Sequence, residues 1–210
     1  MFELIYLIDL SFLKVNDKED SCIGKQELQE EIKKMKKKLL LHSIILDKYK
    51  EDIEEKEEKS ISALKYLIDP ENKFIRSKSE EIKKSFEEYS TEKAISEVLK
   101  YIKTIETIKW PITFWLSFED IDKYKIGDDM DKCLLICSLL NALDVNSKIL
   151  VDEDKRPYLL YNLDLVFYLI DCDEGEIMNG SKKEILDSKT FIYSFNDKEY
   201  DDLSEEEISL

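Results

Sequence analysis

The apolar pattern of residues 25–58 constrains the fold of this chain more than any other feature of its sequence. Apolar side chains recur there at alternating intervals of four and three residues, the spacing of a heptad seam, which predicts a long helix over 25–58. The seam consists of Leu28, Ile32, Met35, Leu39, His42, Leu46, Tyr49 and Ile53. We interpret His42 as a partly buried packing residue. Four more apolar residues widen the middle of the helix and favour packing on two sides there. They are Leu40, Leu41, Ile44 and Ile45.

The rest of the first half predicts shorter amphipathic helices. Asp69 and Pro70 are typical of a helix start, with the aspartate as N-cap and the proline at the first helical position. Ser90 and Thr91 predict the start of another helix, since serine and threonine are good N-caps. The sequence therefore predicts a helical region over residues 1–90.

The second half has the pattern of a helix packed on a small sheet. A strongly apolar helix is expected over 130–143. Runs of β-branched and aromatic residues follow it, separated by polar turns, and predict strands with Asp164 at the tip of one hairpin. These runs are 147–151, 158–163, 165–170 and 191–195. Residues 196–210 hold seven acidic residues against one lysine and predict a loose acidic tail. We therefore expect an α+β fold with an antiparallel sheet.

The charge balance argues against two classes of partner. The chain has 48 acidic and 32 basic residues, a net charge of −16, so it should repel nucleic acid and anionic membranes. Its apolar start is interrupted by Glu3 and Asp9, is too short to span a membrane and lacks the charge order of a signal peptide. We expect no nucleic-acid partner, no membrane partner and a cytoplasmic location.

The cysteines do not predict a metal or redox motif. None of Cys22, Cys133, Cys137 and Cys172 belongs to a C-x-x-C pair. Cys133 and Cys137 are one helical turn apart, and we interpret them as small core residues. The single histidine, His42, leaves a nitrogen-containing metal site almost without ligands. We expect no cofactor, and a reducing compartment.

One stretch of the second half carries a family resemblance. An aromatic lead-in, FWLSF at 114–118, precedes Gly127 and Asp128, which open the apolar helix; a strand and a hairpin ending at Asp171 follow. Over 114–151 and 156–171 this order resembles the core of the transglutaminase-like superfamily, a papain-related group of thiol proteases, amidases and acyl transferases. The resemblance implies a transglutaminase-like core over 91–195, with a helix packed on a small antiparallel sheet.

The enzymes of that superfamily use a cysteine, a histidine and an aspartate. The cysteine thiolate is stabilised at a helix N-terminus, a histidine on a neighbouring strand takes its proton, and an aspartate orients the histidine. In this chain Asp129 falls at the cysteine position and Arg156 at the histidine position, whereas Asp171 matches the orienting acid. Arginine keeps its proton at any usable pH. The resemblance therefore implies a pseudoenzyme, a non-catalytic relative.

The replaced residues suggest a structural role. Arg156 could bridge two carboxylates, so we expect Asp129, Arg156 and Asp171 to form an ion cluster in which the pKa values of both acids are lowered. We also expect Asp129 to serve as the N-cap of its helix. A nucleophilic Cys133 would require the helix to begin one turn later, which would rotate its apolar stripe off the core.

The function expected from the sequence is protein–protein binding or scaffolding. A peptide could occupy the former active-site cleft, and the seam of helix 25–58 offers a second protein-binding or self-association surface. Two alternatives remain open. One is a structural component of a larger assembly, such as a virion. The other is a hydrolase with altered chemistry that uses Asp129 and Asp171 as paired acids.

Overall fold

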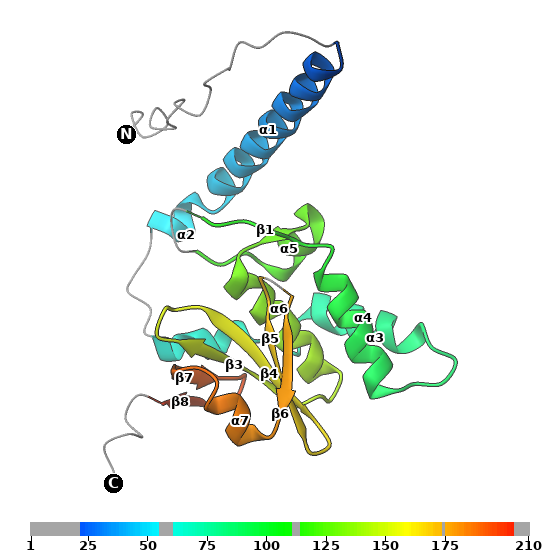
Figure 1. Ribbon diagram of the computed structural model, residues 1–210, viewed down its shortest axis with the longest axis vertical. Helices are drawn as coiled ribbons and strands as arrows, with labels where there is room; N and C mark the ends of the chain where they lie inside the picture. Colours follow the sequence, from blue (N-terminus) through cyan, green and yellow to red (C-terminus); the bar gives the residue numbers. More distant parts are fainter. Residues whose placement is uncertain (1–21, 55–60, 111–113, 174, 204–210) are drawn as a thin grey trace. The chain divides into compact units, whose positions relative to one another are not determined.

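The structure is a computed structural model that describes residues 22–54, 61–110, 114–173 and 175–203. The chain has an α+β fold and divides into two compact units, Met1–Glu51 and Asp52–Leu210. Figure 1 shows the helices and strands with the labels used below. The domain boundary expected near residue 90 lies inside the second unit. It falls between the helices Lys73–Lys84 and Thr91–Ile102, which both pack against the helix Asp129–Ala142.

The heptad pattern forms a helix that is interrupted once. Helix α1 (Cys22–Lys48) is followed by the short helix α2 (Lys50–Glu54), so the single helix expected over 25–58 is not continuous. The amide of Tyr49 still donates to the carbonyl of Ile45 at 2.9 Å, so the break is confined to one residue. Residues 55–58 lie outside the described residues.

The seam is buried only toward its end. Ile45 and Tyr49 are buried, and His42 is half-buried as expected. Most of the earlier apolar positions are solvent-exposed, with exposed fractions from 43 % to 66 %. They are Leu28, Ile32, Met35, Leu39, Leu40 and Ile44. The sequence predicts that the middle of the helix packs on two sides. This prediction is wrong for Leu40 and Ile44, which are exposed.

Three helical segments follow α2 in the second unit. They are the 3₁₀ helix η3 (Ile61–Leu67), α3 (Lys73–Lys84) and α4 (Thr91–Ile102). Helix α4 begins after Ser90, as predicted. Helix α3 begins three residues later than predicted, because Asn72 rather than Asp69 is its N-cap. The Asn72 side chain accepts hydrogen bonds from the amides of Phe74 and Ile75 at 2.8 and 3.4 Å.

A central helix follows two short strands. Strand β1 (Glu106–Thr107) pairs in parallel with β2 (Ile126–Gly127), and α5 (Phe118–Tyr124) lies between them in sequence. Helix α6 (Asp129–Ala142) matches the predicted apolar helix to within a residue at each end, and ten of its residues are buried. Helices α3 and α4 both pack against α6.

The main sheet has six antiparallel strands in the order β6-β5-β4-β3-β7-β8 (Figure 1). Its strands are β3 (Ser147–Asp152), β4 (Pro157–Leu163), β5 (Val166–Asp171), β6 (Ile177–Gly180), β7 (Phe191–Phe195) and β8 (Tyr200–Asp202). The four predicted strands are confirmed as β3, β4, β5 and β7. Asp164 lies at the β4–β5 turn with φ 54°, a left-handed conformation that aspartate tolerates.

The expected acidic tail is partly ordered structure. Residues 200–202 form the edge strand β8, which pairs with β7 in the register Tyr193 to Asp202 and Phe195 to Tyr200. The rings of Tyr193 and Tyr200 lie 6.0 Å apart, so an aromatic cross-strand contact holds this acidic segment on the sheet. Residues 204–210 lie outside the described residues.

Each face of the sheet packs against a different helix. Helix α6 packs on β3 and β4, and α7 (Lys182–Leu186) packs beside β5 and β6. The cluster on the α7 side contains Leu150, Tyr158, Leu160, Leu169, Ile185 and Phe191. Because side chains alternate along a strand, the neighbouring residues Ile149, Leu159 and Ile170 point to the α6 side, and all three are buried. This alternation decides which expected site residues can meet.

Candidate functional site at the start of helix α6

Helix α6 begins with a reciprocal capping box. Asp128 is the N-cap, with extended backbone, and its carboxylate accepts the amide of Asp131 at 2.7 Å. The Asp131 carboxylate accepts the amide of Asp128 at 3.1 Å through Oδ2 and the amide of Leu116 at 3.1 Å through Oδ1. The expectation that Asp129 caps the helix is therefore wrong by one residue, because Asp129 already has helical geometry as the first residue of α6.

Gly127 makes this arrangement possible. A Cβ atom at position 127 would lie 3.1 Å from the Cβ of Asp131, which is closer than ordinary packing allows. The glycine therefore lets the Asp131 side chain fold back over the end of β2. A glycine at position 127 is therefore explained by the room that the capping side chain of Asp131 needs.

Both capping carboxyl groups have raised pKa values. Burial raises the pKa of Asp128 to about 6, against the opposing effect of the Asp131 amide. Burial also raises the pKa of Asp131 well above its ordinary value, and the Asp128 carboxylate adds to the shift. The start of α6 thus holds two acids that share one desolvated site.

Asp129 has a different environment from the one expected. Its pKa is raised, chiefly by burial and next by the neighbouring Asp173 carboxylate, while Lys109 and Lys132 act in the opposite direction. Its Oδ1 atom is buried without a hydrogen-bond partner among the described residues. The prediction that Arg156 lowers the pKa of Asp129 is therefore wrong. The cations that act on Asp129 are the two lysines, and their effect is smaller than that of burial.

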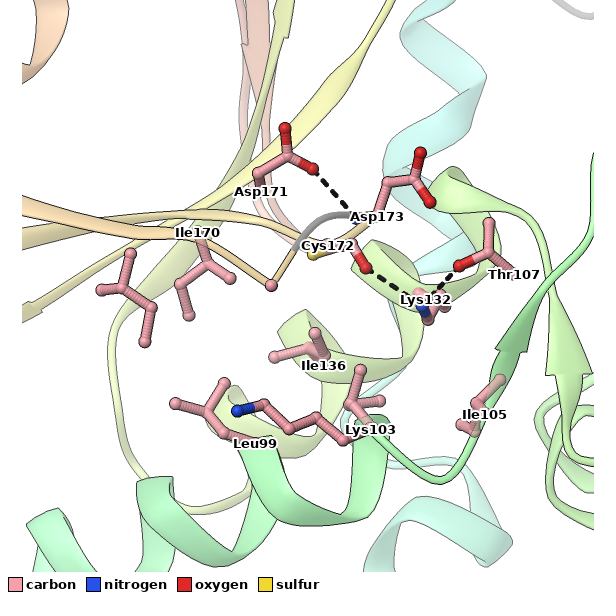
Figure 2. Close-up of a pocket in the computed structure, with 13 residues that line it drawn as sticks. Leu99, Lys103, Ile105, Thr107, Lys132, Ile136, Ile170, Asp171, Cys172 and Asp173 are labelled. Carbon is pink, nitrogen blue, oxygen red and sulfur yellow. Dashed lines mark hydrogen bonds between the residues drawn. The ribbon is translucent and has the colours of Figure 1, made fainter.

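Of the three triad positions, two meet. The Arg156 Nη2 atom lies 3.7 Å from Oδ2 of Asp171, and the Arg156 side chain is 44 % exposed. In the described part of the chain, no ion pair or hydrogen bond joins Asp129 to Arg156. Asp171 pairs in register with Tyr158, which belongs to the cluster on the α7 side. Figure 2 shows its carboxylate pointing away from Ile136 of α6. Asp129 therefore makes no direct contact with Arg156, although the Asp171 carboxylate is near enough to add to the raised pKa of Asp129.

A pocket of about 390 Å³ opens beside the start of α6. Its apolar wall comes from α4, α6 and β5, with Leu99, Ile136 and Ile170 turned toward one another (Figure 2). Its polar wall comes from Lys103 and from the segment that follows β5, where Asp171 Oδ1 accepts the amide of Asp173 at 2.9 Å. The pocket thus combines an aliphatic floor with charged groups of both signs.

Lys132 is a site residue that the sequence analysis missed. It is 5 % exposed, and its ammonium group donates to Thr107 Oγ1 at 2.7 Å and to the Cys172 carbonyl at 3.0 Å (Figure 2). It connects β1 with the segment after β5. A lysine within the apolar run of α6 was the signal that could have identified it, because a buried ammonium group needs such partners.

Cys133, Cys137 and Cys172 are buried. Cys133 Sγ lies 2.9 Å from Cys172 Sγ, and Cys137 Sγ lies 3.4 Å from the Ser147 hydroxyl. Burial raises the pKa of Cys133 well above the usual thiol value and raises that of Cys137 to about 12. These two thiols are therefore protonated at neutral pH, the opposite of an activated nucleophile.

The described residues contain no group of three or more histidine, cysteine or acidic residues placed to hold a metal ion. Within the same ranges, no helix combines the length and apolar character that crossing a bilayer requires. The chain matches no protein-family model and no sequence among the curated proteins.

Proposed function

We propose that this chain is a non-catalytic protein-binding domain, related to the transglutaminase-like superfamily, that holds a peptide segment in the pocket beside α6. The order of an Asp-capped helix α6 and the antiparallel strands β3, β4 and β5 supports the relationship. The pocket is the observation that carries the binding function, because it offers an aliphatic floor with charged groups on its wall.

The chemistry of the site supports a non-catalytic role. The helix start presents Asp129, and a carboxylate is a far weaker acyl-transfer nucleophile than a thiolate. The thiol of Cys133 lies one turn further along α6, is fully buried and has a raised pKa. The single histidine of the chain, His42, belongs to α1. The second unit thus has no histidine to activate Cys172 on the pocket wall.

The charge of the chain favours a cationic peptide. The net charge is −16, and Asp171 and Asp173 both line the pocket. An aliphatic residue of the peptide would pack on Leu99 and Ile136, and its basic residues would lie near the two carboxylates.

Peptides selected from a random library against the immobilised full chain test this proposal. Ile177 lines the pocket and is 52 % exposed, so Ile177→Trp should narrow the pocket without loss of the fold. Met178 is its neighbour on β6, is similarly exposed and does not line the pocket, which makes Met178→Trp the matched control. We expect selected peptides to be basic and to lose about tenfold or more in affinity for Ile177→Trp alone. Equal binding to both variants, or no enrichment of peptides, would contradict the proposal.

A scaffolding role through α1 is supported by its exposed seam. Leu28, Ile32, Met35 and Leu39 leave a continuous apolar stripe open to solvent. Acidic residues at 30 and 31 precede five lysines within 33–38, so a parallel pair would place lysines opposite lysines, whereas an antiparallel pair would place acids opposite lysines. We propose antiparallel self-association, as would suit a component of a larger assembly.

Light scattering across a concentration series tests the self-association. Leu39→Lys should convert a wild-type dimer to a monomer, because it places an ammonium group in the apolar seam. Leu165→Lys, at a position 90 % exposed in the β4–β5 turn, is the control and should leave the dimer intact. A monomeric wild-type chain at every concentration would rule this role out.

A hydrolase that uses Asp129 and Asp171 remains the second candidate function. The observation in its favour is the raised pKa of Asp129, which a general acid requires. Turnover of an amide or glycoside substrate that disappears in Asp129→Asn would support this candidate, and the absence of turnover in the wild-type chain would leave the binding function.

A further inference from the structure

The thiols of Cys133 and Cys172 form a close contact between two distant parts of the chain. Cys133 lies in the second turn of α6, and Cys172 follows β5 directly, 39 residues later in sequence. Their sulfur atoms are 2.9 Å apart, and the residues are 0 % and 4 % exposed. A disulfide bond is about 2.05 Å long, so the two sulfur atoms would need to approach by roughly 0.9 Å.

The neighbouring residue Lys132 holds the two segments in this relationship. Lys132 directly precedes Cys133 on α6. Its ammonium group donates to the backbone carbonyl of Cys172 at 3.0 Å. The contact between α6 and the segment after β5 is thus fixed both by a hydrogen bond and by the thiol pair.

The pocket beside α6 gives a small oxidant access to this pair. Cys172 is one of the residues that line the cavity of about 390 Å³, whereas Cys133 lies behind it in the core. A peroxide is small enough to enter a cavity of this size, so Cys172 is the thiol that it would reach first. Cys133 is then in place to react with the oxidised sulfur.

We propose that Cys133 and Cys172 are an oxidisable dithiol, a redox modification site that takes a peroxide and closes to a disulfide joining α6 to the end of β5. The Cys172 thiolate attacks one peroxide oxygen; the S–O bond forms, the O–O bond breaks, and the departing hydroxide takes up a proton to become water. Cys133 then attacks the Cys172 sulfur; the S–S bond forms, the S–O bond breaks, and hydroxide leaves with the Cys133 proton as a second water. Two thiols lose two electrons in total, and one hydrogen peroxide becomes two waters.

This inference does not depend on the proposed binding function. Oxidation would replace the thiol contact by a covalent link between the wall of the pocket and the helix behind it. The link closes a long loop, so the oxidised chain should resist urea better than the reduced chain. Burial raises the pKa of Cys133, so the closing step should be slow at neutral pH.

Peptide mapping of the full chain after treatment with hydrogen peroxide tests the proposal. A Cys22→Ser background leaves three thiols, and remaining thiols are blocked with N-ethylmaleimide before digestion. We expect a loss of two hydrogens in the intact mass and a linked pair of peptides that contain Cys133 and Cys172. Cys137 provides the matched control, because it lies on the same helix, is equally buried, and contacts Ser147 instead. The link should persist in Cys137→Ser and disappear in Cys133→Ser and in Cys172→Ser.

The wild-type map decides the matter even where a serine variant fails to fold. Native protein should give the Cys133–Cys172 link at least about tenfold more often than the Cys137–Cys172 link, whereas urea-unfolded protein should lose this preference. Native protein whose thiols stay reduced, whose Cys172 stops at the sulfinic acid, or whose link joins Cys137 would overturn the proposal.

Discussion

Asp128 and Asp131 each accept the backbone amide of the other, so the first turn of α6 is closed by two carboxylates that face one another across three residues. Asp131 has a further role, because its second oxygen accepts the amide of Leu116 from the segment before α5. One buried side chain therefore ties the start of the central helix α6 to the segment that precedes α5.

Asp131→Ala should destabilise the chain more than the loss of an ordinary helix cap. The change leaves the amides of Asp128 and Leu116 without their acceptor in a buried place, at a cost of about 2–3 kcal/mol in the free energy of unfolding. Glu184→Ala removes the equivalent bond, which the Ser181 amide donates, from the exposed capping box of α7, and should cost about 1 kcal/mol or less. Urea unfolding measures both values, and similar losses in the two variants would contradict this account.

The raised pKa of Asp128 makes stability fall as the pH rises. The pKa rises from its ordinary value of 3.8 to about 6 in the folded chain, so the folded state binds more protons than the unfolded state between these values. Its contribution is fully present below about pH 4 and is lost as the pH passes 6. Asp128→Asn keeps a capping side chain without the charge, and should flatten the pH dependence of the unfolding free energy between pH 4 and 7. A wild-type curve with the same slope as Asp128→Asn would contradict this prediction.

The triad positions can be examined by double-mutant cycles. The Arg156 and Asp171 charges are 3.7 Å apart and the Arg156 side chain is 44 % exposed, so the coupling free energy of the pair should be below about 1 kcal/mol. Arg156 and Asp129 should couple by about zero, because no described contact joins them. The cycles would use Arg156→Gln with Asp171→Asn and with Asp129→Asn, measured by urea unfolding. If the coupling free energy between Asp129 and Arg156 were larger than that between Asp171 and Arg156, the expected ion cluster of all three residues would be supported.

Introducing the cysteine and histidine of the transglutaminase-like enzymes should not introduce their chemistry. In Asp129→Cys with Arg156→His, the new thiol and imidazole should not meet, because Arg156 lies beside Asp171 and makes no described contact with Asp129. The rate at which iodoacetamide alkylates the new thiol should therefore be the same, within about twofold, in the single variant Asp129→Cys and in the double variant. Faster alkylation of the double variant, or amide hydrolysis by it, would show that the three positions can form a working triad.

The sequence predicts the elements of this fold better than their packing. Helix α6 and strands β3, β4, β5 and β7 have long apolar or β-branched runs, and the structure confirms all of them. The missed elements include β1, β2, β6, α7 and β8, each of five residues or fewer, which is too short for a periodic pattern to identify. The seam of α1 shows the opposite problem, since an apolar repeat does not tell whether a partner covers it.

The candidate site was predictable in position and not in geometry. Spacing along the chain correctly placed 129 at a helix start and 171 at a strand end. It could not show which face of the sheet each side chain takes, because a shift of one residue reverses that face. Ile170 and Cys172 therefore point to α6, while Asp171 shares the face of Tyr158. Lys132 was missed for a related reason, since only the tertiary contacts reveal its partners.

The strand order of the main sheet has a consequence for how the chain folds. Its hairpins β3–β4, β4–β5, β5–β6 and β7–β8 join strands that follow one another in sequence, whereas the β3–β7 pairing joins strands separated by three others and α7. Closing that long loop is entropically costly, so we expect the β7–β8 hairpin to dock after the rest of the sheet has assembled. Weakening β7 should then accelerate unfolding while the folding rate stays nearly constant.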